Sequence, residues 1–83
     1  MNINRLDLKI LCILAKENCI NELAGMTVDE INGYNNEVIA SRVQVVKRIK
    51  LLVEKDYVKK GILDNKAITY FITKTGLETI NWI

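Results

Sequence analysis

The chain has 83 residues, of which 49% are apolar and 27% charged, so we expect one folded domain over residues 1–83. It contains no histidine, which excludes a Ser-His-Asp triad, a histidine-ligated metal site and an imidazole base. The net charge is +2, and no apolar run approaches the ~20 residues that span a bilayer, so we expect no membrane-spanning segment. We expect a cytoplasmic binding protein that is not an enzyme and that holds no metal or cofactor.

The first periodic segment runs from Leu6 to Ala15 and predicts a helix, with Asn4 as its N-cap and Asp7 three residues later. Its apolar side chains form two stripes on opposite sides, so both sides have to be covered. The stripes are Leu6, Ile10, Ile13 and Leu14 on one side and Leu8, Leu11, Cys12 and Ala15 on the other. The core of a small domain covers one stripe. We expect the second in a subunit interface or beneath later segments.

Cys12 and Cys19 lie seven positions apart, which on a continuous helix separates their Cα atoms by about 10 Å. A disulfide needs a separation below about 7 Å, so no intrachain bridge is expected. Two thiols without histidine also do not make a zinc site. We interpret Cys12 as a small apolar side chain, with a redox role or an intermolecular bridge as the alternative.

Thr27 followed by Glu30 predicts the capped start of a short second helix, and Gly33 predicts a left-handed residue at its end. The third helix is the longest and ends near Asp56, but either Asn36 or Ser41 can cap its start. Its inward stripe consists of Val45, Val46, Ile49, Leu52 and Val53. The polar side chains opposite are Gln44, Lys47, Arg48 and Lys55.

After Asp56 the pattern changes to two segments rich in β-branched and aromatic residues, 57–63 and 67–73, with Asp64 and Asn65 as the tight turn between them. Thr73 or Thr75 then caps a short last helix that holds Leu77, Ile80, Trp82 and Ile83. The predicted fold is therefore mainly α with a small β-hairpin (α+β), in the order helix, helix, helix, strand, strand, helix.

The small net charge hides an asymmetry between the two halves of the chain. Residues 1–40 carry three basic and six acidic side chains, a net −3, whereas residues 41–83 carry nine and four, a net +5. Residues 42–60 alone hold seven Lys and Arg against two acidic side chains. Such clustering on neighbouring elements is typical of a protein that binds a polyanion, although basic side chains are also ordinary surface residues.

Four stretches resemble winged helix-turn-helix DNA-binding regulators, with the MarR-like, PadR-like and ArsR-like groups nearest in pattern. These stretches are residues 27–31, 42–49, 52–58 and 70–77, and with the segments between them they cover most of the chain. Two departures stand out. Asp56 replaces the usual glycine before the first wing strand, and a few extra residues separate Ile31 from the third helix.

The resemblance implies that the third helix enters the major groove of double-stranded DNA and that the hairpin forms a wing on the backbone. It places Ser41, Arg42, Gln44, Lys47 and Arg48 at the major groove and Lys59, Lys60, Asn65 and Lys66 on the wing. Arg42 and Gln44 would read bases, because these side chain types pair bidentately with guanine and adenine. Arg48 and the lysines would contact phosphates. If the third helix starts early, Arg42 instead falls on the buried stripe and is structural.

We therefore expect a sequence-specific DNA-binding protein that acts as a homodimeric transcriptional regulator, a repressor. A dimer is expected because a single domain reads only a few base pairs. The residues expected to pair the subunits are Leu8, Leu11, Cys12, Ala15, Trp82 and Ile83. One alternative is a plasmid or phage DNA-binding adaptor for partition or replication. Another is a winged-helix protein–protein interaction module whose basic face meets an acidic partner.

Overall fold

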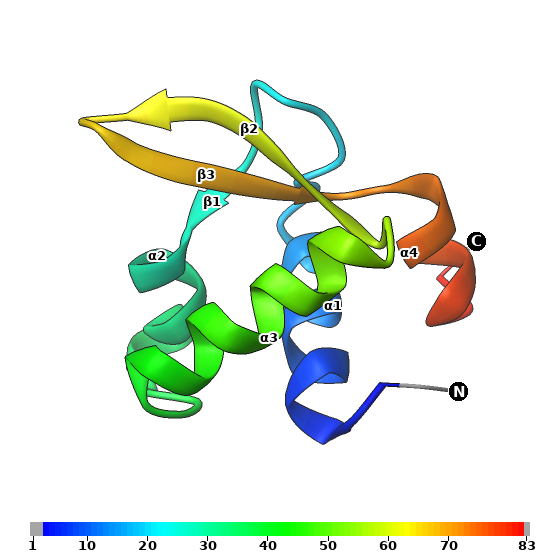
Figure 1. The fold of residues 1–83 in the computed structure, drawn as a ribbon, viewed down its shortest axis with the longest axis horizontal. Helices are drawn as coiled ribbons and strands as arrows, with labels where there is room; N and C mark the ends of the chain where they lie inside the picture. The colour runs from blue at the N-terminus through cyan, green and yellow to red at the C-terminus, as the bar shows by residue number, and fades with distance from the viewer. Residues whose placement is uncertain (1–2, 83) are drawn as a thin grey trace.

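The computed structural model describes residues 3–82. Its elements are α1 (Arg5–Lys16), β1 (Met26–Thr27), α2 (Val28–Asn32), the 3-10 turn η1 (Tyr34–Asn36), α3 (Arg42–Glu54), β2 (Val58–Asp64), β3 (Ala67–Ile72) and α4 (Lys74–Thr79). In Figure 1 the hairpin of β2 and β3 extends to one side above α1, α2 and α3, and α4 lies near the base of the hairpin. The predicted mainly α domain with a small β-hairpin is confirmed.

The sheet contains one strand that the sequence did not predict. β1 pairs antiparallel with β3, with Met26 opposite Tyr70, so the order of the three strands is β1-β3-β2. β1 has two residues, too few to show an alternating pattern. The register of β2 against β3 shifts between Lys60 and Leu63, which marks an irregularity in the hairpin.

Side-chain caps fix where the helices begin. Reciprocal bonds between a capping side chain and the third helical residue are present at Asn4 for α1, Thr27 for α2 and Ser41 for α3. The Thr73 hydroxyl caps α4 by accepting a bond from the Gly76 amide. α3 therefore begins at Arg42, which settles the choice between Asn36 and Ser41 in favour of Ser41.

Left-handed backbone occurs at different residues from some of those predicted. Gly33 has φ −96° and is not left-handed, so the predicted left-handed end of α2 is wrong. Asn35 and Asn36 take that conformation instead, with φ 56° and 62°. Asp56, in the position of the usual glycine, has φ 64°, because a short polar side chain tolerates this region better than most.

The hairpin turn lies one residue later than predicted. β2 extends through Asp64, and the two turn residues are Asn65 and Lys66, with φ 50° and 71°. A positive φ at both positions is what a two-residue type I′ turn requires. The turn places Asn65 and Lys66 at the far tip of the wing, the hairpin formed by β2 and β3 (Figure 1).

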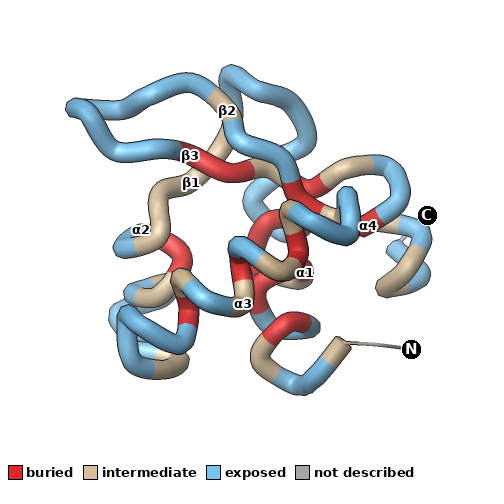
Figure 2. Tube along the Cα trace, in the orientation of Figure 1, coloured by how far each residue is buried: buried red, intermediate tan, exposed pale blue. Residues whose placement is uncertain are grey.

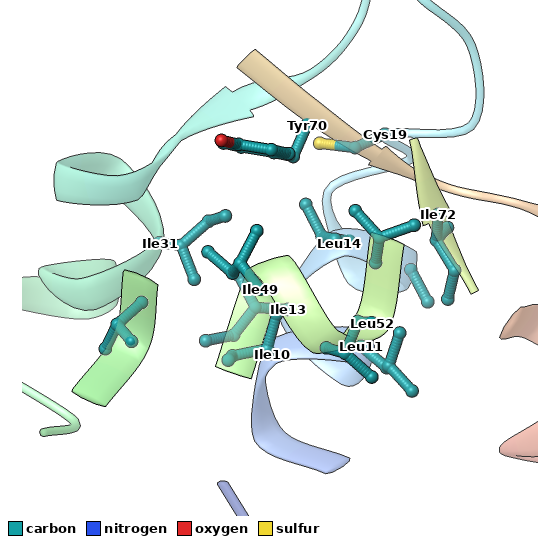
Figure 3. Close-up of a cluster of buried hydrophobic side chains, with 13 residues drawn as sticks. Ile10, Leu11, Ile13, Leu14, Cys19, Ile31, Ile49, Leu52, Tyr70 and Ile72 are labelled. Atoms are coloured by element: carbon teal, nitrogen blue, oxygen red, sulfur yellow. The ribbon is translucent and has the colours of Figure 1, made fainter. Parts of the chain in front are cut away.

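The core forms where α1, α2, α3 and β3 meet, as Figures 2 and 3 show. Ile10 and Leu14 of α1 pack there with Ile31, Ile49 and Leu52. Side chains from the second stripe of α1 are also in the core. Leu11 is fully buried and Ala15 is 7% exposed, so their predicted place in a subunit interface is wrong.

The rest of the predicted interface has a different position. Leu8 is 41% exposed, Cys12 is half-buried and Trp82 is 46% exposed, so all three reach the surface. Ile83 lies outside the described residues. The second stripe of α1 is thus divided between the core and the surface, because the rest of the domain covers Leu11 and Ala15 but leaves Leu8 and Cys12 at the surface.

The two cysteines do not share a helix, because α1 ends at Lys16. Both thiols are free, as expected. Burial, together with the charges of Glu17 and Glu30, raises the pKa of the Cys19 thiol. A buried, protonated thiol is unreactive, so Cys19 serves as a core side chain.

Candidate nucleic-acid interface

α3 presents one face to the core and the opposite face to solvent. Val45, Ile49 and Leu52 are buried. Residues 43, 47, 50 and 54 recur at helical spacing on the other side, and all four are exposed. We call these four residues the outward stripe. It contains two lysines, Lys47 and Lys50, one turn apart.

Three adjoining depressions follow α3 and the hairpin. The first is lined by Arg42, Val43, Val46, Lys47 and Lys50. The second lies between α3 and the hairpin, and its lining includes Arg42, Val46 and Lys66. The third includes Lys50, Lys60 and Tyr70. Neighbouring depressions share lining residues and form one groove. We call it the basic groove, because five cations of α3 and the wing border it against two carboxylates, Asp29 and Glu54.

The two adjacent lysines of β2 face opposite ways. Lys60 pairs with Tyr70 across the hairpin and lines the basic groove. Successive side chains alternate between the faces of a strand, so Lys59 projects from the other face. Its ammonium lies 4.0 Å from the Asp56 carboxylate. The structure therefore brings Lys60 and Lys66 together with α3, but not Lys59.

The N-terminus of α3 is organised by its own cap. The Ser41 hydroxyl accepts a hydrogen bond from the backbone amide of Gln44 at 3.2 Å, and the side-chain oxygen Oε1 of Gln44 accepts one from the backbone amide of Ser41 at 3.3 Å. Ser41, Arg42 and Gln44 are exposed. Arg42 Nε donates to Asp29 Oδ1 at 3.0 Å in an ion pair whose side chains are 65% and 77% exposed. The exposure of the Arg42 side chain contradicts the alternative in which this residue belongs to the buried stripe.

Arg48 has a partner inside the chain. Its Nε and Nη2 atoms each donate to a carboxylate oxygen of Asp7 at 2.7 Å, in a bidentate pair that joins α3 to α1. Asp7 is fully buried, and the Arg48 side chain is 23% exposed. The prediction that Arg48 lies on the outward polar face and contacts phosphate is therefore corrected: its guanidinium is engaged beneath that face.

The charge state of Asp7 follows from this pairing. Burial by itself would raise the pKa of the carboxyl, but the hydrogen bonds from Arg48 and the Asn4 amide, with the charges of Arg48 and Lys55, outweigh it. The net effect lowers the pKa of Asp7 from its ordinary value. The hydrogen bond to Asp7 likewise raises the pKa of Arg48. Both groups are charged at neutral pH and form a salt bridge.

The sequence interpretation missed two side chains of this surface. Lys50 lines the basic groove beside both α3 and the wing, and Val43 is 78% exposed at the second position of α3. Helical periodicity counted from Ser41 would have found both, because they fall on the outward stripe with Lys47. Their spacing from Lys47 is the same for either start of the helix, so the signal was present in the sequence.

Within residues 3–82 the structure contains neither a candidate metal site nor a candidate membrane-spanning helix. No group of three acidic, cysteine or histidine residues in this range could hold a metal ion. No helix in the same range is long and apolar enough to cross a membrane.

Comparison with known proteins identifies the family. No protein-family model matches the chain. The chain is 30% identical over 83 residues to the DNA-binding protein TubR of a Clostridium botulinum C phage, in an alignment that covers all of this chain and 99% of that protein. The chain belongs to the TubR family. The findings support the winged helix-turn-helix resemblance, but they do not single out the MarR-like, PadR-like or ArsR-like pattern.

Solved structures agree with this assignment at the level of the fold. TubR from Bacillus megaterium pBM400 has a TM-score of 0.80 at 15% identity, over 96% of the TubR-family chain described here and 84% of that chain. MepR, a transcription regulator of the Staphylococcus aureus multidrug efflux pump MepA, has a TM-score of 0.76 at 14% identity. That match covers 98% of this chain and 55% of MepR. The arrangement of helices and small sheet is thus shared with both proteins.

Proposed function

We propose that this chain is a sequence-specific double-stranded DNA-binding protein that works in the cytoplasm as a homodimeric transcriptional regulator, a repressor. The observation that carries the proposal is the basic groove, where cations of α3 and of the wing border one surface. Those cations are Arg42, Lys47, Lys50, Lys60 and Lys66. The relation to a protein named DNA-binding supports the same function.

In this proposal α3 enters the major groove with its outward stripe toward the bases. Its 13 residues span about 20 Å, and its N-terminal end carries the side chains that reach base edges. Lys47, Lys50, Lys60 and Lys66 contact phosphates, which supplies affinity without sequence information. Asn65 reaches the backbone at the tip of the wing, whereas Lys59 projects from the opposite face beside Asp56 and is left out of the contact.

Arg42 is proposed to exchange Asp29 for guanine. An exposed ion pair is worth about 0–1 kcal/mol. A bidentate contact with a base discriminates by about 1–3 kcal/mol, so the exchange favours the DNA. Because the oxygen of Gln44 is held by the Ser41 amide, we propose that Gln44 offers a base its side-chain nitrogen alone.

The test is random-site selection on duplex DNA, followed by a salt titration on the selected site. Four phosphate contacts per subunit, from Lys47, Lys50, Lys60 and Lys66, predict that log affinity falls with log salt at a slope of about −3.6 per subunit. Lys47→Ala should reduce that slope by about 1. Lys16→Ala, an exposed lysine at the end of α1, serves as the matched control and should leave the slope unchanged. A slope that does not respond to Lys47→Ala would contradict the proposed groove.

A second function has one observation in its favour. The relative is a phage protein, and the alignment spans nearly all of both chains. This match favours a plasmid or phage adaptor for partition or replication. The selected sites distinguish the two roles: a repeated array bound cooperatively supports the adaptor, and one site overlapping a promoter supports the regulator. Absence of DNA affinity at low salt would leave the protein–protein interaction module.

A further inference from the structure

Val43 is the most exposed of the large apolar side chains among residues 3–82, at 78%. It is the second residue of α3 and stands on the outward stripe one turn before Lys47. A β-branched residue is a poorer helix former than alanine or lysine, so the start of the helix gains nothing from it. The core gains nothing either, because the side chain points away from Val45 and Ile49.

Single exposed apolar residues are common, but Val43 is not isolated. With Val46 it supplies the apolar part of a depression whose remaining lining is Arg42, Lys47 and Lys50. This surface combines two different chemistries. The cations match phosphates and base acceptors, whereas the two valines can satisfy neither.

The major groove displays one apolar group on its base edges, the 5-methyl group of thymine. All other recognition features there are hydrogen-bond donors and acceptors. An exposed valine at the N-terminal end of a helix that enters the groove therefore matches a single feature of the DNA.

We propose that Val43 is a specificity-determining residue that recognises thymine by packing its γ-methyl groups against the 5-methyl group. The inference rests on the proposed DNA-binding function. Val43 selects for an A·T pair at its position in each half-site. Lys47 and Lys50 beside it hold the backbone, and the methyl contact favours thymine over cytosine at the base that Val43 reaches.

The experiment replaces thymine by deoxyuridine, one position at a time, in the site recovered by random-site selection. This change removes the 5-methyl group and leaves every hydrogen-bonding group in place. For the unmodified protein we expect one position per half-site at which affinity falls about fourfold, the equivalent of ~0.8 kcal/mol for one buried methyl group. Val43→Ala should bind the thymine and uracil forms of that position equally.

Val38→Ala is the matched control. Val38 is 77% exposed, as Val43 is, but lies in the segment before α3, so this variant should keep the fourfold loss. Equal losses in the unmodified protein and Val43→Ala, or no loss at any thymine, would overturn the role of Val43 while leaving DNA binding intact. Failure of the unmodified protein to bind duplex DNA would overturn the proposed function and this inference together.

Discussion

Asp7 links two parts of the molecule through one carboxylate. Its Oδ2 atom accepts a hydrogen bond from the backbone amide of Asn4 at 3.0 Å, which completes the cap of α1. Both of its oxygens also accept from Arg48 of α3. The carboxylate is fully buried, so it depends on these donors in place of water. Removing one member of a buried pair costs more than the pair itself contributes, because the other charge stays buried without its partner.

We expect Asp7→Asn to lower the free energy of unfolding by about 3 kcal/mol at pH 7, measured by urea denaturation. The pKa of Asp7 is lower in the folded chain than in the unfolded one, so the carboxylate contributes its full stability above about pH 4, the ordinary value. That contribution is lost as the pH falls through the folded pKa. The difference in free energy of unfolding between the unmodified chain and Asp7→Asn should therefore narrow below pH 4. A difference that stays constant down to pH 2 would contradict this account.

The sequence predicted half of this arrangement. The spacing of Asn4 and Asp7 indicated a capped helix, because a cap is formed by neighbours in the chain. The partner of Asp7 lies 41 positions away, and Arg48 appears in the sequence as one more polar residue of α3. Periodicity places a side chain on a side of its helix but does not reveal what another helix presents there.

The wing is an element whose conformation conflicts with one of its residues. Lys66 has φ 71°, in the left-handed region, where a side chain with a Cβ costs roughly 1 kcal/mol or more. Glycine adopts this region without that cost, and Asn-Gly is the preferred pair for such a turn. A lysine at this tip is explained by its charge, which faces the basic groove from the wing.

Lys66→Gly should therefore separate stability from binding. We expect it to raise the free energy of unfolding by about 1 kcal/mol, measured by thermal denaturation, because it relieves the backbone. The same variant should weaken DNA binding and reduce the salt slope by about 1. Lys66→Ala is the control, with the same loss of slope and no gain in stability. An unchanged slope in both variants would remove Lys66 from the interface.

The hairpin also shows how far local patterns extend. Two segments rich in β-branched residues predicted both long strands, and turn chemistry favoured Asp64-Asn65 over Asn65-Lys66, because lysine rarely adopts the left-handed region. The choice depends on pairing across the strands, including the shift between Lys60 and Leu63, which the sequence does not display. β1 escaped prediction for a related reason: its two residues are held by β3, not by their own pattern.

At the scale of the whole molecule, subunit pairing stays a prediction. The apolar surface available for it is smaller than the six residues that the sequence predicted. The core takes Leu11 and Ala15, which leaves Leu8 and Cys12 on α1 and Trp82 after α4. The sequence showed that α1 is apolar on two sides. It could not divide the second side between core and surface, because that division depends on how later segments wrap around the helix.

Leu8→Glu tests the pairing. A charge in an apolar interface is costly, so we expect this variant to sediment as a monomer where the unmodified chain sediments as a dimer. The monomer should also lose the preference for two half-sites about one helical turn apart. Leu23→Glu, a change at a 76% exposed residue outside α1, should remain dimeric. A dimer that persists in Leu8→Glu would place the contact elsewhere.

The salt bridge between α1 and α3 has a geometric consequence for such a dimer. If subunits pair through α1, two short bonds fix each α3 relative to the pairing helix and hence to the other α3. The separation of the two reading helices is then a rigid dimension of the protein, and the operator has to match it in base-pair count. Insertion of a single base pair between half-sites, which rotates one of them by about a tenth of a turn, would misalign one of the two helices.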